Sequence, residues 1–192
     1  MLFTVSGPLR SIARIAIDAF TQTNYLPPAR GMLLARFIRC SSHSSRRDIM
    51  HKTASAKWHG GIKDGQGSIS TQTGVLRDAP YGFASRFEGG PGTNPEELIG
   101  AAHAGCFTMA FSLFLTEAGF KADSIETKST VTLEKVGEGF SITACQLDMT
   151  AKIPGIDQAT FEKLATGAKE NCPVSKLFAN NAKISLNATL AS

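Results

Sequence analysis

Hydrophobic residues are densest in the middle of the chain, where the sequence from Asn94 to Leu115 reads NPEELIGAAHAGCFTMAFSLFL. Thr93 or Asn94 can cap a helix, Pro95 suits the first helical position, and two glutamates follow where the helix dipole favours acids. Gly119 is a natural stop. The pattern predicts a long helix that is buried on most of its sides.

Alternating polar and apolar residues predict strands on both sides of this helix. Before it, residues 53–76 form a meander of two or three strands, and residues 81–90 form a short strand or an extended loop. After it, we expect a hairpin, an amphipathic helix capped by Asp157, a short helix and a last strand, over residues 127–153, 157–172, 173–181 and 182–190. This order predicts an α+β fold in which helices pack against antiparallel sheet.

The first 49 residues differ from the rest in charge. Residues 1–47 hold seven arginines, no lysine and one aspartate, a net charge of +6, whereas the remainder carries −2. Arg10 and Arg14 share one face of a potential helix, as in a mitochondrial transit peptide. The alternative is an untranslated leader, with Met50 as the true start. We therefore expect a fold over residues 50–192, and a cytoplasmic protein unless residues 1–49 are a genuine transit peptide.

The rest of the chain lacks the charge of a nucleic-acid-binding surface. His103 and the glutamates at the start of the long segment, together with its many small residues, argue against a membrane span. Small residues instead let another helix approach closely. Neither nucleic acid nor membrane is therefore expected as a partner.

The four cysteines, Cys40, Cys106, Cys145 and Cys172, match no zinc-binding spacing and include no CxxC motif. Cys172 precedes a proline that can open a helix. The positive end of a helix dipole favours a thiolate there and improves nucleophilic attack. The alternative is a half-buried structural cysteine. The composition favours a reducing compartment with one or two working thiols.

Cys106 lies about three turns into the long helix, beyond the reach of that helix's own dipole. Burial should raise the pKa of its thiol, so a nucleophilic role needs a nearby cation. Arg86 is the best candidate, because an arginine can stabilise a thiolate while binding a carboxylate. Glu96 shares the Cys106 face but lies about 15 Å away along the axis, so it would orient Arg86. The alternative is a core cysteine and a surface arginine.

Three further residues have weaker claims. His103 is a potential base one turn before Cys106, but a core histidine is the favoured interpretation. Cys145 shares a strand face with Leu147 and Met149 and is interpreted as packing. Cys40 has no assigned role.

Two stretches, PYGFASRFEGGPGTNPEELIGAAHAGCF and KENCPVSKLF, together resemble the OsmC/Ohr family of osmotically inducible and organic hydroperoxide resistance proteins. The similarity is greatest to the OsmC branch and covers roughly residues 52–190, so the N-terminal extension is outside it. The resemblance rests on the Asn-Pro-Glu-Glu-Leu opening ahead of one cysteine and on Cys-Pro-Val-Ser at the other.

The resemblance implies a thiol-dependent peroxidase that acts on organic hydroperoxides and needs no metal, haem or flavin. It implies an intertwined homodimer with long central helices and outer sheets. Cys106 would attack the peroxide, Cys172 would resolve the intermediate as a disulfide, Arg86 and Glu96 would assist, and a dithiol would restore both thiols. An apolar wall would favour organic peroxides; its expected members are Phe83, Phe87, Phe107 and Met109.

Two other functions fit the same residues. A redox sensor would use the disulfide to switch a partner surface, although the sequence shows no appended effector domain. A protein that binds small apolar ligands would use both cysteines only for structure.

Overall fold

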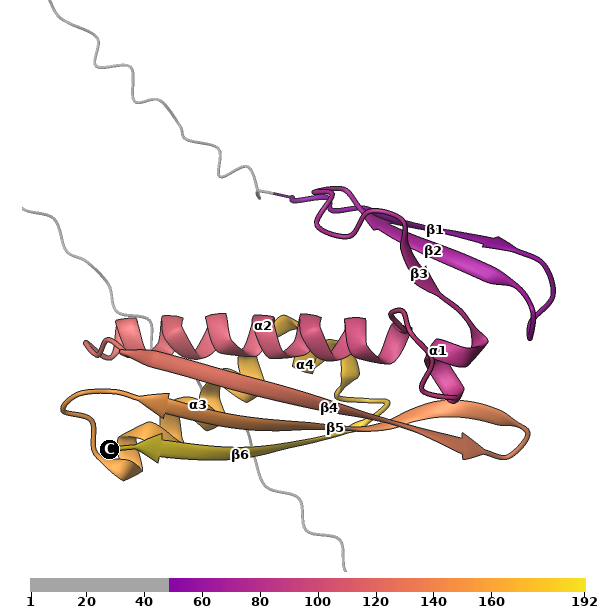
Figure 1. Cartoon of the computed structure of the whole chain (residues 1–192). Helices are drawn as coiled ribbons and strands as arrows, with labels where there is room; N and C mark the ends of the chain where they lie inside the picture. Colours follow the sequence, from indigo (N-terminus) through magenta and orange to yellow (C-terminus); the bar gives the residue numbers. More distant parts are fainter. Residues whose placement is uncertain (1–48) are drawn as a thin grey trace, which may run out of the picture. The chain divides into compact units, whose positions relative to one another are not determined.

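The computed structural model describes residues 49–192, which form two three-stranded sheets and four helices (Figure 1). The expectations for Arg10, Arg14 and Cys40 lie outside the described residues. The elements are β1 (Ala54–His59), β2 (Gln66–Thr71), β3 (Ala79–Tyr81), α1 (Phe83–Phe87), α2 (Pro95–Glu117), β4 (Ser124–Val136), β5 (Gly139–Lys152), α3 (Gln158–Asn171), α4 (Pro173–Phe178) and β6 (Lys183–Ala191).

The first sheet is the predicted meander. β1, β2 and β3 pair in sequence order, and both pairings are antiparallel. The rings of Trp58 and Tyr81 meet across the sheet, with centroids 5.5 Å apart. A Cβ on Gly67 would lie 2.2 Å from a Tyr81 ring carbon. The strand therefore needs glycine at this position to let the aromatic ring lie over its backbone.

The segment after β3 differs from the expectation of a strand or extended loop. Phe83–Phe87 is a short helix, α1, stabilised by the hydroxyl of Ser85. The Ser85 hydroxyl accepts from the N–H of Gly82 at 2.9 Å and donates to the carbonyls of Gly82 and Thr93, at 3.1 and 2.9 Å. A helix of one turn shows no periodicity, so the sequence pattern could not reveal it.

The long helix α2 begins as predicted. Asn94 accepts a hydrogen bond from the N–H of Glu97 at 2.9 Å, and Pro95 occupies the first turn. The helix ends at Glu117, just before Gly119, whose φ of +83° is readily adopted only by glycine. By length and composition alone it could cross a membrane, with a mean hydropathy of 1.7. In the described chain one side of α2 packs against β4, α3 and α4. The expectation of burial on most sides is not met within one chain, because the buried residues of α2 form a single stripe.

The second sheet has the order β4-β5-β6, and the three helices α2, α3 and α4 cover one of its faces (Figure 1). β4 and β5 form the predicted antiparallel hairpin. β6 pairs with β5 in parallel, so the expectation of purely antiparallel sheets was wrong for this strand. The cause is the connection, because α3 and α4 form a crossover that returns the chain to the same end of the sheet.

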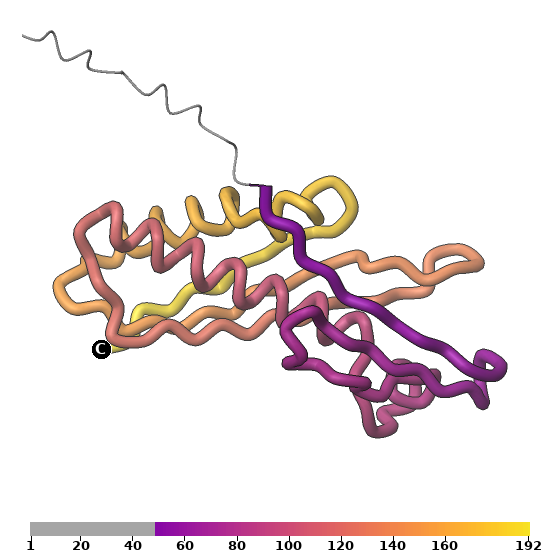
Figure 2. The backbone as a smooth tube through the Cα atoms, turned by 90° about the horizontal axis from the view of Figure 1, so that it is seen from above, coloured from indigo at the N-terminus to yellow at the C-terminus, as the bar shows by residue number. Residues whose placement is uncertain are grey.

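The core lies between this sheet and the helices. Figure 2 shows α2 and α3 side by side over the strands. The amphipathic pattern of α3 predicts an apolar stripe of Phe161, Leu164, Ala165 and Ala168. Phe161, Ala165 and Ala168 are fully buried and Leu164 is half-buried, so the stripe faces the core. The buried cluster comprises Phe107, Phe111, Leu115, Leu147, Met149, Ala151, Ile153, Phe161, Ala165, Ala168 and Cys172. One of the two cysteines of interest is therefore part of the core.

Candidate active site

The structure brings Cys106 and Cys172 together. Cys106 lies near the middle of α2, and Cys172 joins α3 to α4 as the N-cap residue of α4. Their side chains are in hydrogen-bonding contact, and both are free thiols. Cys172 is fully buried, whereas Cys106 is half-buried. The two sulfurs therefore meet at the surface of the core, although 66 positions separate them in the sequence.

The N-terminus of α4 points at Cys106. The backbone N–H of Val174, in the first turn of α4, donates to the Cys106 sulfur. The helix expected to begin at the Cys-Pro pair is present, and an N–H of its first turn lies at the Cys106 sulfur. Cys106 is too far into α2 to benefit from its own helix, but it lies at the positive end of a different one. The Cys-Pro pair indicated where this helix starts. Which thiol the helix start meets depends on tertiary packing.

Two opposing influences act on the Cys106 thiol. Burial raises its pKa above the ordinary value, and the neighbouring Cys172 thiol adds to this effect. The N–H of Val174 lowers the pKa, because it stabilises the thiolate. Burial dominates, so the thiol of the single chain is mainly protonated near neutral pH. Activation therefore requires positive charge beyond what the single chain supplies at this sulfur.

Arg86 and Glu96 form the second part of the site. The Arg86 Nη2 lies 2.6 Å from the Glu96 Oε1, and the Nε lies 3.2 Å from both carboxylate oxygens. This two-nitrogen contact fixes the guanidinium plane. The N-terminal turn of α2 is tied to α1 by hydrogen bonds from Ser85 to the Thr93 carbonyl and from Asn94 to the Ser85 carbonyl. The expected pairing of Glu96 with Arg86 is therefore present.

The ion pair and the cysteines are separate within one chain. Glu96 and Cys106 are ten residues apart on α2, which corresponds to about 15 Å of helix axis. The side-chain hydrogen bonds of Arg86 within the described residues go to Glu96 alone. The chain therefore presents an arginine–glutamate pair at one end of α2 and a thiol pair near its middle.

The ion pair borders a pocket whose lining is partly polar and partly apolar. The pocket has a volume of about 530 Å³, and its apolar lining includes Ile99, Leu133, Phe140, Ile142 and Phe178. The expected wall of Phe83, Phe87, Phe107 and Met109 does not form in the described chain. The rings of Phe83 and Phe87 contact each other at a tilt near Arg86, but Phe107 lies in the core and Met109 faces outward, 76% exposed. The positions of these residues along their helices could not predict which side chains lie near Arg86, which lie in the core and which are exposed.

His103 and Cys145 are both buried. The His103 Nε2 lies 2.9 Å from the Ser175 Oγ, and burial lowers the pKa of the imidazole. Its Nδ1 has no hydrogen-bond partner among the described residues. Cys145 is buried on β5 with Leu147 and Met149, and burial raises the pKa of its thiol. Within residues 49–192, no group of three or more His, Cys, Asp or Glu side chains is arranged to hold a metal ion.

Known proteins resemble this chain in sequence and fold. Residues 88–187 match the family described as OsmC-like protein. The chain is 52% identical to Peroxiredoxin OsmC of Escherichia coli over 143 residues, covering 74% of this chain and 99% of that protein. It is 30% identical to the organic hydroperoxide resistance protein of Xanthomonas axonopodis pv. citri over 99 residues, covering 51% of this chain and 68% of that protein.

Solved structures agree with these matches. An organic hydroperoxide resistance protein OsmC from Legionella pneumophila superposes with a TM-score of 0.56 at 28% identity, covering 71% of this chain and 96% of its own. OhrB of Bacillus subtilis, an organic hydroperoxide resistance protein, gives a TM-score of 0.55 at 29% identity and covers 71% and 98%. The matched family, the relatives and the solved structures lead to one assignment: this chain belongs to the OsmC family.

Proposed function

We propose that the chain is a thiol-dependent peroxidase that reduces organic hydroperoxides, and hydrogen peroxide less well, in the oxidative and osmotic stress response. The observation that carries the proposal is the contact between the Cys106 and Cys172 thiols, with the Val174 N–H on the Cys106 sulfur. The names of the relatives, Peroxiredoxin OsmC and organic hydroperoxide resistance protein, support the same activity.

Cys106 is the peroxidatic residue in this proposal. The residue is half-buried, whereas Cys172 is fully buried. The Cys106 thiolate attacks one oxygen of the hydroperoxide and the O–O bond breaks. The departing alkoxide takes a proton and leaves as the alcohol, and Cys106 becomes a sulfenic acid. The sulfur loses the two electrons that the peroxide gains.

Cys172 resolves this intermediate. Its thiolate attacks the Cys106 sulfur, the S–S bond forms, and the S–O bond breaks with release of hydroxide that leaves as water. The side chains already touch in the thiol state, so only a small movement is needed. A small dithiol or a dithiol protein then reduces the disulfide by two exchange steps and is itself oxidised.

A homodimer completes the site. One side of α2 is exposed and formed by small or apolar residues, with Met109 at 76% and Leu113 at 55% exposure. Such a face favours a close helix–helix contact, and the occupant proposed is a second copy of the chain; the other exposed members are Ala101, Ala102, Gly105 and Ser112. Within one chain the guanidinium and the Cys106 sulfur are too far apart. In the homodimer, Arg86 of the partner subunit supplies the positive charge that Cys106 lacks.

The pocket beside the ion pair accounts for the choice of substrate. In the proposed homodimer the pocket, like Arg86 beside it, lies next to the reactive sulfur of the other chain. The organic part of a hydroperoxide therefore lies against Ile99, Phe140 and Phe178. Each buried CH₂ group contributes about 0.8 kcal/mol to binding, which hydrogen peroxide cannot gain. Organic hydroperoxides are therefore the better substrates. The reducing cytoplasm suits this chemistry, and residues 1–49 form an extension outside the peroxidase domain.

Turnover of cumene hydroperoxide with dithiothreitol tests the proposal. The wild-type chain should consume peroxide catalytically, and Cys106→Ser should abolish consumption. Cys172→Ser should give one turnover and a sulfenic acid that can be trapped, because the first step survives. Cys145→Ala is the matched control and should retain activity. One reaction without recycling would instead indicate a sensor, and indifference to both substitutions would indicate that the cysteines are structural.

A further inference from the structure

His103 and Ser175 flank the cysteine pair symmetrically. His103 lies three residues before Cys106 on α2, and Ser175 lies three residues after Cys172 on α4. Their side chains are both buried and are joined by a hydrogen bond of 2.9 Å. Within the described residues, and apart from the contact between the two cysteines, it is the only hydrogen bond between a side chain of α2 and a side chain of α4. Neither residue has a role in the peroxidase chemistry proposed above.

The short helix α4 needs such a contact. It has only six residues, its N-cap residue makes no side-chain hydrogen bond, and its first turn contains no acidic residue. A helix of this length is not stable by propensity alone, so tertiary contacts set its position. His103 contacts its first turn and its last residue, because its ring bonds to Ser175 and packs edge-on against Phe178, with centroids 5.8 Å apart. The imidazole therefore holds the whole of α4 against α2.

We propose that His103 and Ser175 are positioning residues of the thiol site. Their hydrogen bond fixes the first turn of α4, and this turn carries both the Cys172 sulfur and the Val174 N–H that meet the Cys106 sulfur. The proposal rests on the peroxidase function, since it assigns the pair to the step in which Cys172 resolves the sulfenic acid. Loss of the bond leaves α4 packed but lets its first turn rotate, so the two sulfurs meet less often.

The geometry favours positioning over proton transfer. The Nε2 is used by Ser175 and the Nδ1 has no partner among the described residues, so neither ring nitrogen is hydrogen-bonded to a cysteine. Burial keeps the imidazole neutral by lowering its pKa. A neutral ring can pair with Ser175 in either tautomer, because a hydroxyl both donates and accepts. An apolar ring would fill the same space, so the hydrogen bond supplies orientation rather than bulk.

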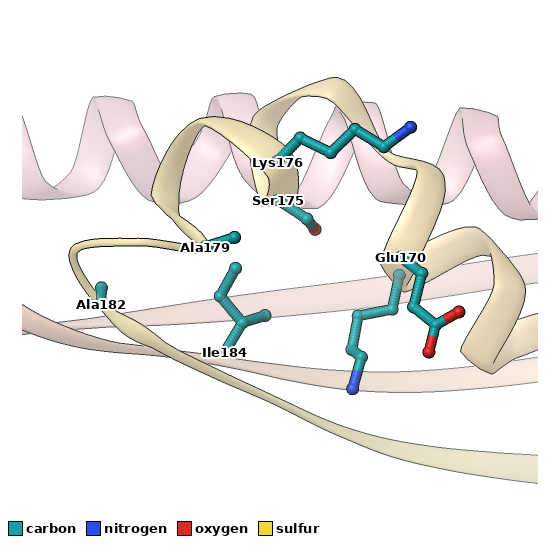
Figure 3. Close-up of a pocket in the computed structure, with 7 residues that line it drawn as sticks. Glu170, Ser175, Lys176, Ala179, Ala182 and Ile184 are labelled. Atoms are coloured by element: carbon teal, nitrogen blue, oxygen red, sulfur yellow. The ribbon is translucent and has the colours of Figure 1, made fainter. Parts of the chain in front are cut away.

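Ser175 also lies at the bottom of a surface pocket of about 320 Å³ (Figure 3). In this view the Lys176 side chain projects away from Ser175, and Ala182 and Ile184 lie across from α4. Ser175 is only 3% exposed and its hydroxyl is bonded to His103, so it is not a free surface group. The pocket leaves space between α4 and Ile184, so α4 is not tightly packed on this side when the bond to His103 is removed.

Four variants test the proposal. His103→Phe and Ser175→Ala remove the hydrogen bond, whereas His103→Gln places an amide near the original Nε2 and can restore it. Thr127→Val is the matched control, because it removes the 2.8 Å bond from Thr108 of α2 without touching α4. Thermal melts should show that each variant is folded. If His103→Phe does not fold, Ser175→Ala alone tests the loss of the hydrogen bond.

The readout is the lifetime of the sulfenic acid. Reduced protein receives one equivalent of cumene hydroperoxide, a sulfenic-acid trap is added at timed intervals, and mass spectrometry follows disulfide formation. His103→Phe and Ser175→Ala should slow this step on the order of tenfold, the scale of one lost hydrogen bond. His103→Gln and Thr127→Val should stay within about twofold of wild type, and His103→Phe/Ser175→Ala should be no slower than the single variants.

Two results would overturn the positioning role. One is a wild-type rate in a folded His103→Phe or Ser175→Ala chain. The other is a His103→Gln rate as slow as that of His103→Phe, because a titrating ring rather than a hydrogen bond would then be required.

A glutathione redox buffer separates this proposal from the peroxidase function. Glutathione disulfide oxidises the two thiols to the Cys106–Cys172 disulfide and is reduced to two glutathione molecules, without any hydroperoxide. The effective concentration of one thiol at the other should fall on the order of tenfold in Ser175→Ala. If Ser175→Ala shows this loss but the wild-type chain reduces no hydroperoxide, only the proposed function is contradicted. An unchanged value alongside normal peroxide turnover would contradict only the positioning role.

Discussion

Mixing two inactive variants tests whether Arg86 acts across a homodimer. One chain carries Arg86→Ala and keeps Cys106, and the other carries Cys106→Ser and keeps Arg86. In a mixed dimer, one of the two sites combines the intact cysteine of the first chain with the intact arginine of the second. The account predicts that this site is active, although neither variant is active by itself.

The expected recovery follows from the geometry. Arg86 is held on Glu96 at 2.6 Å, and about 15 Å of helix axis lies between Glu96 and Cys106 of the same chain. The account therefore takes the arginine of each site from the partner chain. Random pairing of equal amounts makes about half of the dimers mixed, and each mixed dimer has one competent site of two. The mixture should regain about a quarter of wild-type activity per chain.

The assay is cumene hydroperoxide consumption with a dithiol, after the two chains have been refolded together and mixed dimers verified by native mass spectrometry. A mixture of Cys106→Ser with Cys172→Ser is the matched control. It should stay inactive in multiple turnover, because both sulfurs of a site come from one chain. Mixed dimers of the first pair that show no gain over the separate variants would refute action of Arg86 across the interface.

Further predictions concern the interface, the thiol and the response to acid. Gly105→Trp should yield a folded monomer in light scattering, because an added Cβ meets no heavy atom of its own chain within 4 Å; a dimer would contradict the proposed contact. Arg86→Ala should raise the pKa of Cys106, so alkylation should require higher pH; an unchanged pH profile would refute the role of Arg86. Burial lowers the pKa of His103, so the unfolded chain binds a proton near the ordinary value of 6.5 and the folded chain does not. Stability should fall as pH drops below this value, and melting temperatures of His103→Gln should lose that part of the decline.

Local sequence signals were enough to predict the elements that carry the thiols. Asn94, Pro95 and the two glutamates mark the start of α2, and the Cys-Pro pair marks the start of α4. Asn94 caps α2 through a neighbour within one turn, and each proline suits a first helical position, so both signals are local. The buried stripe of α3 follows from periodicity alone.

The remaining features depend on contacts between distant segments. The helix α1 is held by Ser85 through a bond to Thr93, eight residues away, and the parallel pairing of β6 follows from the path of two helices. The bond of His103 to Ser175 spans 72 positions. The Val174 N–H reaches Cys106 only because α4 packs against α2. No local pattern encodes such pairings, so sequence alone left His103 as a core residue and did not reveal that the Val174 N–H meets the Cys106 sulfur.

Disulfide mapping after a single turnover is the most direct test of the pairing between Cys106 and Cys172. Reduced wild-type protein receives one equivalent of cumene hydroperoxide and is then digested without a reductant. The account predicts one molecule of alcohol per chain, a mass loss of two hydrogen atoms, and a peptide containing Cys106 joined to one containing Cys172. Peroxide consumption that leaves these two thiols unlinked, or that oxidises Cys145 instead, would contradict the account.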